Sequence, residues 1–291
     1  MRVIEPRQIK PAKKSTLRLR RPRKLVIVGL SAFVLLGLAA WWSDLYPDKS
    51  LTGYFFDNKD TAVETNSADA QLITYTPTGF TDLYSTFSYP NTKEIIAPPS
   101  VTGNAIADER IRTLAEKRGY SLQSTPVARI VKTDEPNLPG DDSLQPLALG
   151  AWQDLKESAK AVGVPLRLQS AYRSVEYQRQ LFVNELTATA AYTIDIANGL
   201  ADTQLNRILA TTAPPGYSRH HTGYAIDLAC YPGGVFIDFA DSPCHVWLSA
   251  NNYENAKKHG WIPSYPTGAI NQGPEPESWE YVWVGVDRLT N

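Results

Sequence analysis

The chain of 291 residues is 43% hydrophobic and 20% charged, a composition that excludes a disordered protein and allows one well-packed domain with additional segments. Its formal net charge of -1 conceals an asymmetry, because residues 1–24 contain ten Lys or Arg and one acid, which leaves -10 for residues 25–291. An acidic body of this kind argues against nucleic acid as a partner of the folded part.

A charge-free apolar segment follows directly after the basic run. It covers the 18 residues 25–42, which at about 1.5 Å rise each just span a hydrocarbon core of roughly 30 Å. Lys and Arg before it, and Trp41 with Trp42 at its far end, predict a single transmembrane helix with residues 1–24 as a basic cytoplasmic segment. We therefore expect a single-pass protein of the cell membrane whose remaining chain is extracytoplasmic.

Two other interpretations of this N-terminal region stay open. A cleaved signal peptide has a weak small-x-small site at residues 37–39, although the long apolar run and the Trp pair after it argue against cleavage. The basic run is also typical of an arm that binds nucleic acid, which the acidic body of the chain disfavours.

Residues 43–100 are rich in Asp, Thr, Ser, Asn, Tyr and Pro and show no sustained periodicity. This composition predicts an extracytoplasmic stalk or spacer, with one or two short strands at residues 72–75 and 94–97. Residues 101–291 are then expected to form the folded domain.

Regular structure is predicted from about residue 104. Apolar residues recur at helical spacing through residues 106–115, 152–162 and 175–186, and Gly119 and Gly163 follow the first two as stop signals. Strands are predicted at residues 166–171, 224–228 and 281–286. Since the helices come first and the strands gather late, the pattern favours an α+β domain over a doubly wound one.

The two cysteines of the chain, Cys230 and Cys244, lie close together in the sequence. In an oxidising compartment such a pair favours a disulfide bond. A zinc site would normally include a second Cys or His pair at short spacing, and the sequence has none.

Residues 214–227 place His220 and Asp227 seven positions apart, with Gly223 permitting a tight bend between them. If a strand begins at Tyr224, Ala225 and Asp227 share one of its faces, and the small alanine leaves room for a metal beside the carboxylate. An imidazole nitrogen and a carboxylate oxygen form half of a workable zinc site. Taken alone, the same two residues are more typical of a structural, hydrogen-bonded cluster.

The wider context favours the metal. The stretch fits S-x-H-x-x-G-x-A-x-D and resembles the signature of the VanY-like D-alanyl-D-alanine carboxypeptidases, which have the Hedgehog/DD-peptidase fold. Upstream, residues 170–174 followed by Gln178 resemble the S-x-Y-R-S segment of that family. Downstream, further family-like segments follow in order at Trp247, Asn255-Ala256, Gly260-Trp261, Ser264-Tyr265-Pro266 and residues 279–285. The resemblance covers about residues 101–291.

The resemblance implies a Hedgehog/DD-peptidase-like α+β domain, with a small antiparallel sheet flanked by helices, that holds one zinc ion. It assigns His220 and Asp227 as zinc ligands and Glu277 as the general base that takes a proton from water. Arg173 would stabilise the oxyanion or hold the substrate carboxylate. The substrate-binding residues implied in the same way are Tyr172, Gln178, Ser218 and Trp279.

One position departs from the family pattern. The closing motif of the family is E-x-W-H, whereas residues 277–280 read Glu-Ser-Trp-Glu and place Glu280 where the third ligand, a histidine, is expected. Carboxylate is a legitimate zinc ligand, but it lowers the net charge of the centre from +1 to zero and so weakens its polarising power. We expect slower chemistry or a preference shifted toward other divalent metals.

The other histidines have simpler interpretations. His221 neighbours a predicted ligand but belongs to the variable part of the motif, and His259 ends an apparent helix, where capping is favoured over ligation. His245, beside Cys244, is an alternative third ligand by residue type alone.

The leading hypothesis is a zinc carboxypeptidase that removes the terminal D-alanine from peptidoglycan stem peptides. The alternatives are a catalytically degenerate peptidoglycan-binding protein, indicated by Glu280, and an endopeptidase that cuts cross-links. The expected partners are stem peptides and, through the N-terminal helix, the membrane; nucleic acid is not expected, and the sequence indicates no protein partner.

Overall fold

The computed structural model describes residues 71–135 and 142–291. All of them belong to one compact unit. Within these described residues, no helix has both the length and the apolar character that crossing a bilayer requires. The expected cytoplasmic segment, the transmembrane helix at 25–42 and the first part of the spacer lie outside the described residues.

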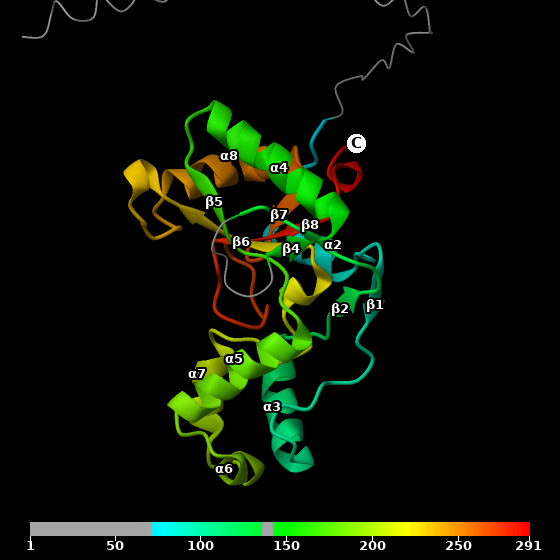
Figure 1. Cartoon of the computed structure of the whole chain (residues 1–291), viewed down its shortest axis with the longest axis vertical. Coiled ribbons are helices and arrows are strands. Elements are labelled where there is room, and N and C mark those ends of the chain that lie inside the picture. Colours follow the sequence, from blue (N-terminus) through cyan, green and yellow to red (C-terminus); the bar gives the residue numbers. More distant parts are fainter. Residues whose placement is uncertain (1–70, 136–141) are drawn as a thin grey trace, which may run out of the picture. The chain divides into compact units, whose positions relative to one another are not determined.

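A four-stranded antiparallel sheet forms the centre of the unit (Figure 1). Its strands lie in the order β5 (Leu166–Ser170), β6 (Ala225–Cys230), β8 (Glu280–Trp283) and β7 (Trp261–Pro263). Every residue of β6 is buried, as expected for a central strand covered on both faces. The register places Asp227 of β6 opposite Glu280 of β8, so the predicted ligands lie on neighbouring strands.

Helices α4 (Pro146–Ala161) and α8 (Pro243–Lys257) cover one face of this sheet (Figure 1). Trp152 and Leu155 of α4 and Leu248 of α8 pack against Ile226 and Tyr281 of the sheet in one buried apolar cluster. The predicted helix through residue 152 is therefore confirmed, and it begins earlier than expected, at a proline in its first turn.

Helix α2 (Pro77–Ser85) covers the opposite face of the sheet. Its Phe80 and Tyr84 pack against Ala225 and Val282, whose neighbours Ile226 and Tyr281 point to the other face. Strand β1 (Thr92–Glu94) follows and pairs with β2 (Ser124–Pro126). Residues 71–100, expected to be part of a spacer, thus contribute a helix and a strand to the domain, which begins earlier than residue 101.

The first and last described residues are hydrogen-bonded to each other. Leu72 forms a β-bridge with Thr290, and the Asn291 N–H donates to the Gln71 carbonyl at 3.1 Å. The predicted strand at 72–75 is therefore reduced to this single bridge, and the strand predicted at 94–97 lies at Thr92–Glu94 instead.

Helices α3 (Ala105–Lys117), α5 (Val175–Ala188), α6 (Thr193–Ala197) and α7 (Asp202–Leu209) form a separate group beside the sheet (Figure 1). Their shared core includes Ile111, Phe182 and Leu205. The predicted helices at 106–115 and 175–186 are confirmed, but Ile106 is 67% exposed and does not belong to the buried face. The sequence did not predict α6 and α7, which have five and eight residues.

The remaining short elements join these groups. They are β3 (Val131–Lys132) paired with β4 (Ser143–Leu144), and the 3-10 turns η1 (Arg219–Thr222), η2 (Pro232–Gly234) and η3 (Val286–Arg288).

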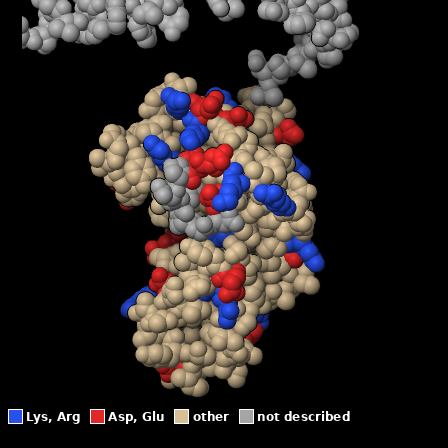
Figure 2. All heavy atoms as spheres, viewed as in Figure 1, with Lys and Arg blue, Asp and Glu red and all other residues tan. Residues whose placement is uncertain are grey.

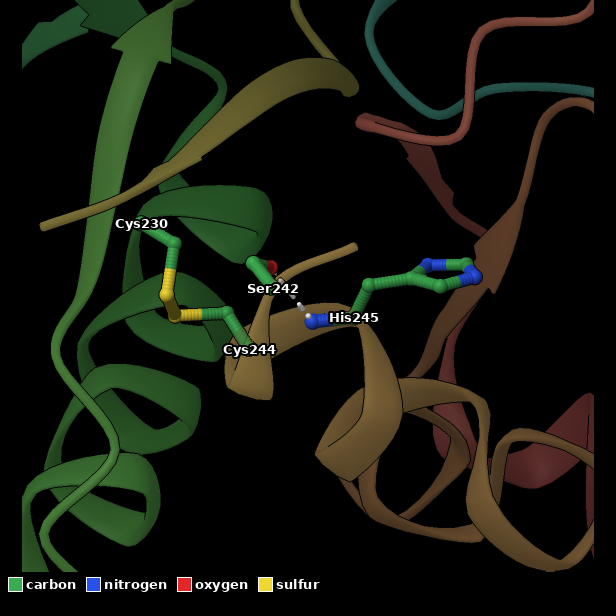
Figure 3. The surroundings of a disulfide bond; sticks show 4 residues. All are labelled: Cys230, Ser242, Cys244 and His245. Carbon is green, nitrogen blue, oxygen red and sulfur yellow. Dashed lines mark hydrogen bonds between the residues drawn. A yellow bond between two sulfur atoms is a disulfide. The ribbon is translucent and has the colours of Figure 1, made fainter. Parts of the chain in front are cut away.

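The predicted disulfide between Cys230 and Cys244 is present (Figure 3). It joins the last residue of β6 to the first turn of α8 across a sequence separation of 14. The Ser242 hydroxyl caps this helix by accepting from the His245 N–H at 3.0 Å. The ring of His245 points away from the disulfide. The bond thus fastens the end of the strand that carries Asp227 to the helix covering the sheet.

Candidate metal centre and active-site cleft

The turn η1 sets the geometry of the site. It begins after Ser218 and ends at Gly223, whose φ of 74° is a left-handed conformation that glycine adopts without strain. A Cβ at this position would also lie 3.1 Å from the side chain of Gln145. The turn reverses the chain into β6 and so brings His220 over Asp227.

His220, Asp227 and Glu280 form a buried cluster whose ligand-type atoms all lie within 4.8 Å of one another. His220 Nε2 lies 3.2 Å from an Asp227 oxygen and 3.5 Å from a Glu280 oxygen. The structure therefore brings together the three residues that the sequence predicted as metal ligands.

The orientation of the His220 ring suits metal binding. Its Nδ1 lies 2.6 Å from the Ala171 carbonyl oxygen, to which it donates, and Nε2 is the atom that faces the two carboxylates. A backbone acceptor on the far nitrogen is the usual way in which a metal-binding imidazole is oriented. One imidazole nitrogen and two carboxylates, buried and converging, fit a zinc ion and also permit harder divalent cations.

Arg173 lies directly against this cluster. Its Nη2 donates to Asp227 at 2.5 Å and lies 3.3 Å from His220 Nε2, and its Nε donates to Ser170 at 3.1 Å. The predicted catalytic cation is thus at the site, where it faces the same atoms that a metal would bind.

The charges of the cluster shift the pKa values of its members. Burial and Arg173 lower the pKa of His220, but the Asp227 carboxylate and hydrogen bonds to Asp227 and Glu280 outweigh them and raise it to about 9. Burial raises the pKa of Asp227, but His220 and Arg173 bring it below its usual value. A divalent cation competes with the Nε2 proton for the same position.

Glu277, the predicted general base, lines the cleft beside these residues. Burial, followed by repulsion from Glu280 and Asp227, raises the pKa of Glu277 to about 8. A carboxyl group whose pKa is close to neutral pH is suited to accept and return a proton during a reaction.

Arg219 is a site residue that the sequence analysis missed. Its side chain is largely buried, and its guanidinium lies between the rings of Tyr84 and Tyr265, 4.7 and 4.6 Å from the ring centroids. It also donates to the Glu280 carboxylate at 3.3 Å. The signal in the sequence was the additional acid at position 280, because a buried carboxylate calls for a cation nearby.

A cavity of about 740 Å³ opens onto this cluster. Its lining includes Arg173, Gln178, Ser218, Glu277 and Glu280. Gln178 Nε2 donates to the Ala213 carbonyl at 2.8 Å, and its Oε1 is buried without a hydrogen-bond partner among the described residues. Gln178 and Ser218 are therefore placed where a substrate would lie.

The other two predicted substrate-binding residues are placed differently. Tyr172 and Trp279 are absent from the lining of this cavity within the described part of the chain, although they neighbour Arg173 and Glu280 in sequence. Trp279 is 37% exposed, and its carbonyl accepts from the Leu228 N–H of β6, directly before β8 begins. Family resemblance located these positions in the sequence but not the directions of their side chains.

None of the other three histidines of the chain belongs to the described ligand cluster. His221 donates from Nδ1 to the Arg173 carbonyl at 2.7 Å and accepts from the Gly216 N–H at 3.0 Å, and burial lowers its pKa to about 4. His259 follows the C-cap of α8. His245, weighed as a replacement ligand, lies beside the disulfide.

Figure 2 shows the charged side chains of the described residues on one face of the molecule. On the face drawn in Figure 2, acidic and basic residues of the described chain are interspersed. A broad basic patch, the usual electrostatic footprint of nucleic-acid binding, is not seen on this face.

Comparison with known proteins gives consistent matches. A family model described as VanY, D-alanyl-D-alanine carboxypeptidase, matches residues 141–286. A D-alanyl-D-alanine carboxypeptidase of Enterococcus faecalis is 30% identical over 141 residues, and the putative carboxypeptidase YodJ of Bacillus subtilis is 27% identical over 141 residues. Each match covers 47% of this chain, and the chain spans about half the length of these curated relatives.

Solved structures also resemble the chain. The LdcB LD-carboxypeptidase is 25% identical with a TM-score of 0.43, over 57% of this chain and 72% of that one. A zinc complex of a vancomycin-resistance D,D-pentapeptidase VanY variant is 21% identical with a TM-score of 0.39, over 55% and 80% of the two chains.

Proposed function

Because the chain belongs to the VanY family of D-alanyl-D-alanine carboxypeptidases, we propose that it is a metal-dependent carboxypeptidase that removes the terminal D-alanine from peptidoglycan stem peptides. The observation that carries this proposal is the buried convergence of His220, Asp227 and Glu280 beside a cleft. Zinc is the metal proposed, and when bound it supplies Lewis acidity to a carbonyl group and to water.

Glu277 acts as the general base and acid of the reaction. It accepts a proton from the water that attacks the scissile carbonyl and returns it to the departing amine. Its position on the cleft and its raised pKa support this role. The pKa is raised because the carboxyl group is buried next to other carboxylates. A metal ion in the cluster would add a positive charge and lower that pKa.

Arg173 supplies a fixed cation at the reacting end of the substrate. Its guanidinium is held by Ser170 and Asp227 and reaches the cleft. It either receives the C-terminal carboxylate of the peptide or stabilises the oxyanion that develops at the scissile bond. Gln178 and Ser218 line the same cleft and are proposed to bind the peptide.

The location is proposed from the sequence. Residues 25–42 hold the chain in the cell membrane, and the domain acts on the extracytoplasmic side, where peptidoglycan and an oxidising environment are found. The disulfide between Cys230 and Cys244 is consistent with that compartment.

A second candidate is a peptidoglycan-binding protein without catalytic activity. One observation favours it: both carboxylates of the cluster already pair with cations, Asp227 with Arg173 and Glu280 with Arg219. Such pairs satisfy the buried charges without a metal.

The test is the zinc content of the full chain together with release of D-alanine from a stem pentapeptide, with and without a chelator. We expect bound zinc and chelator-sensitive release. Glu277→Gln should lower release by about 10²- to 10⁴-fold while zinc is retained. Glu275→Gln, at an exposed acid two residues away, is the matched control and should release D-alanine at the normal rate. Peptide binding without release by the zinc-loaded chain would favour the second candidate.

A further inference from the structure

The cage around Arg219 is built from separate parts of the chain. Its guanidinium donates to the Tyr265 hydroxyl at 2.5 Å, to the Tyr84 hydroxyl at 2.9 Å and to the Gln272 carbonyl at 3.2 Å. With the two tyrosine rings stacked on it, this buried cation is held on several sides. Such a cation is positioned by the fold, and only 12% of its side chain is exposed.

Glu280 divides its two oxygens between Arg219 and the ligand cluster. Oε1 accepts from Arg219 at 3.3 Å, and Oε2 lies 3.5 Å from His220 Nε2. Within the described residues, Glu280 is the carboxylate with which Arg219 forms an ion pair. One oxygen of the carboxylate therefore remains directed toward the metal position while the other is neutralised.

The same cage fixes the strand that carries this ligand. The Ser264 N–H donates to the Glu280 carbonyl at 3.0 Å, and Gln272 Nε2 donates to the Ser264 carbonyl at 2.7 Å and to the Tyr84 hydroxyl at 2.9 Å. The side chain and the backbone of Glu280 are thus tied to one network, which includes Tyr84 of α2.

Formal charges show what this arrangement achieves. A divalent ion held by one neutral histidine and two carboxylates has a net charge of zero, and one held by two histidines and one carboxylate has +1. Arg173, which pairs with Asp227, is left out of both totals; with that convention the Arg219 cation, paired directly with Glu280, returns the total to +1. In a buried site, one such charge has a large effect on cation affinity and on the polarising power of the centre.

We propose that Arg219 is the counter-charge of the additional ligand carboxylate, Glu280, and that it sets the metal affinity of the site by offsetting part of the attraction of that carboxylate for a divalent cation. This inference rests on the proposed metal site but not on the identity of the substrate. Arg219 lines the cleft together with Glu280, and in this proposal it is a positioning residue because it acts on the metal position through that carboxylate. A merely structural ion pair would contribute to stability, and its removal would not tighten metal binding.

The first experiment compares zinc dissociation constants of full-length variants by competition with a chromophoric chelator. Arg219→Gln removes the charge while keeping hydrogen-bond donors, and we expect it to bind zinc at least about tenfold more tightly than the unmodified chain. Arg219→Lys keeps the charge and should bind as the unmodified chain does. Arg167→Gln removes an exposed arginine of β5 and is the matched control, with little expected effect.

A compensating pair keeps the test decisive if Arg219→Gln fails to fold. Glu280→His leaves Arg219 without its carboxylate, so the excess cation should weaken zinc binding at least about tenfold, and Glu280→His combined with Arg219→Gln should recover the loss. Recovery in the double variant supports a matched pair. A double variant no better than Glu280→His, an Arg219→Gln variant that binds zinc no more tightly, or an unmodified chain that takes up no zinc overturns the inference.

D-alanine release measured on the same samples separates this inference from the proposed function. Zinc affinities that shift as expected, with no release from any variant, would leave the counter-charge role standing and reject the carboxypeptidase. D-alanine release with zinc affinities that do not shift among the variants would support the carboxypeptidase and reject the counter-charge role of Arg219.

Discussion

The two sides of the turn η1 present consecutive histidines to different surroundings. On the cluster side, His220 faces the carboxylates of Asp227 and Glu280. On the scaffold side, His221 bonds only to backbone groups, the Arg173 carbonyl and the Gly216 N–H. Both rings are buried, yet the pKa of His220 is raised to about 9 and that of His221 is lowered to about 4.

Burial acts in the same direction on both imidazoles, because it disfavours the charged form of each. What separates them is the charge of their partners. The carboxylates beside His220 favour a positive charge at its ring, either a proton or a metal ion. The backbone partners of His221 keep that ring neutral, and its role is structural. Two adjacent histidines thus have different roles: His220 faces the binding site, and His221 supports the turn.

The largest expected effect comes from removing the ring on the cluster side. His220→Ala should weaken zinc binding by more than about 100-fold, because losing a ligand exceeds the 10- to 100-fold loss typical of its supporting residues. D-alanine release should fall to the level of chelator-treated protein. Chelator competition measures the zinc affinity, and His259→Ala, at a histidine outside the cluster, is the control. Tight zinc binding by His220→Ala would contradict the assignment of the cluster.

A different loss is expected on the scaffold side. His221→Leu leaves the Arg173 carbonyl and the Gly216 N–H buried without partners, which should lower the free energy of unfolding by about 2–4 kcal/mol. Zinc affinity should change far less than in His220→Ala. Urea unfolding of the zinc-free variants gives the first quantity. An unchanged free energy of unfolding would mean that His221 has no supporting role.

The smallest effect is the pH dependence of stability of the zinc-free chain. Stability from His220 is fully present below its unfolded pKa near 6.5 and is lost as pH rises through about 9. Glu277, with a raised pKa of about 8, also lowers stability as pH rises from about 4.5, because the unfolded chain ionises first. His221, with a depressed pKa of about 4, lowers stability as pH falls below 6.5.

Denaturant unfolding should therefore show little net change from pH 5 to about 6.5, where Glu277 and His221 act in opposite directions, and a loss of about 1–3 kcal/mol toward pH 9, where Glu277 and His220 act together. His220→Asn should make the fall above pH 6.5 shallower, and His221→Asn should uncover a fall between pH 5 and 6.5 that is due to Glu277. A flat profile from pH 5 to 9 in the unmodified chain, or no difference between the two variants, would remove the contrast between the two rings.

Sequence reasoning predicted the parts of the molecule that depend on local pattern or on motif spacing. Helical periodicity identified α4 and α5, and the resemblance to the VanY-like family identified His220, Asp227 and Glu280, which the fold brings together. The disulfide followed from compartment and cysteine count.

The features that the sequence did not predict depend on contacts between distant segments. Helix α2 has nine residues and two buried side chains, too few for a periodic signal, and its Tyr84 reaches Arg219 across a sequence separation of 135. The position of Trp279 outside the cleft lining likewise depends on strand pairing between β6 and β8. Such features become visible only when the chain is folded.

The hydrogen bond between Asn291 and Gln71 and the bridge between Leu72 and Thr290 place the two ends of the described domain together. This makes the domain a candidate for circular permutation, since a linker of a few residues would join them. New termini could be opened in the turn at residues 198–200 between α6 and α7. The permuted chain would keep the order of residues from η1 to β8, and with it every ligand of the cluster, on one uninterrupted segment.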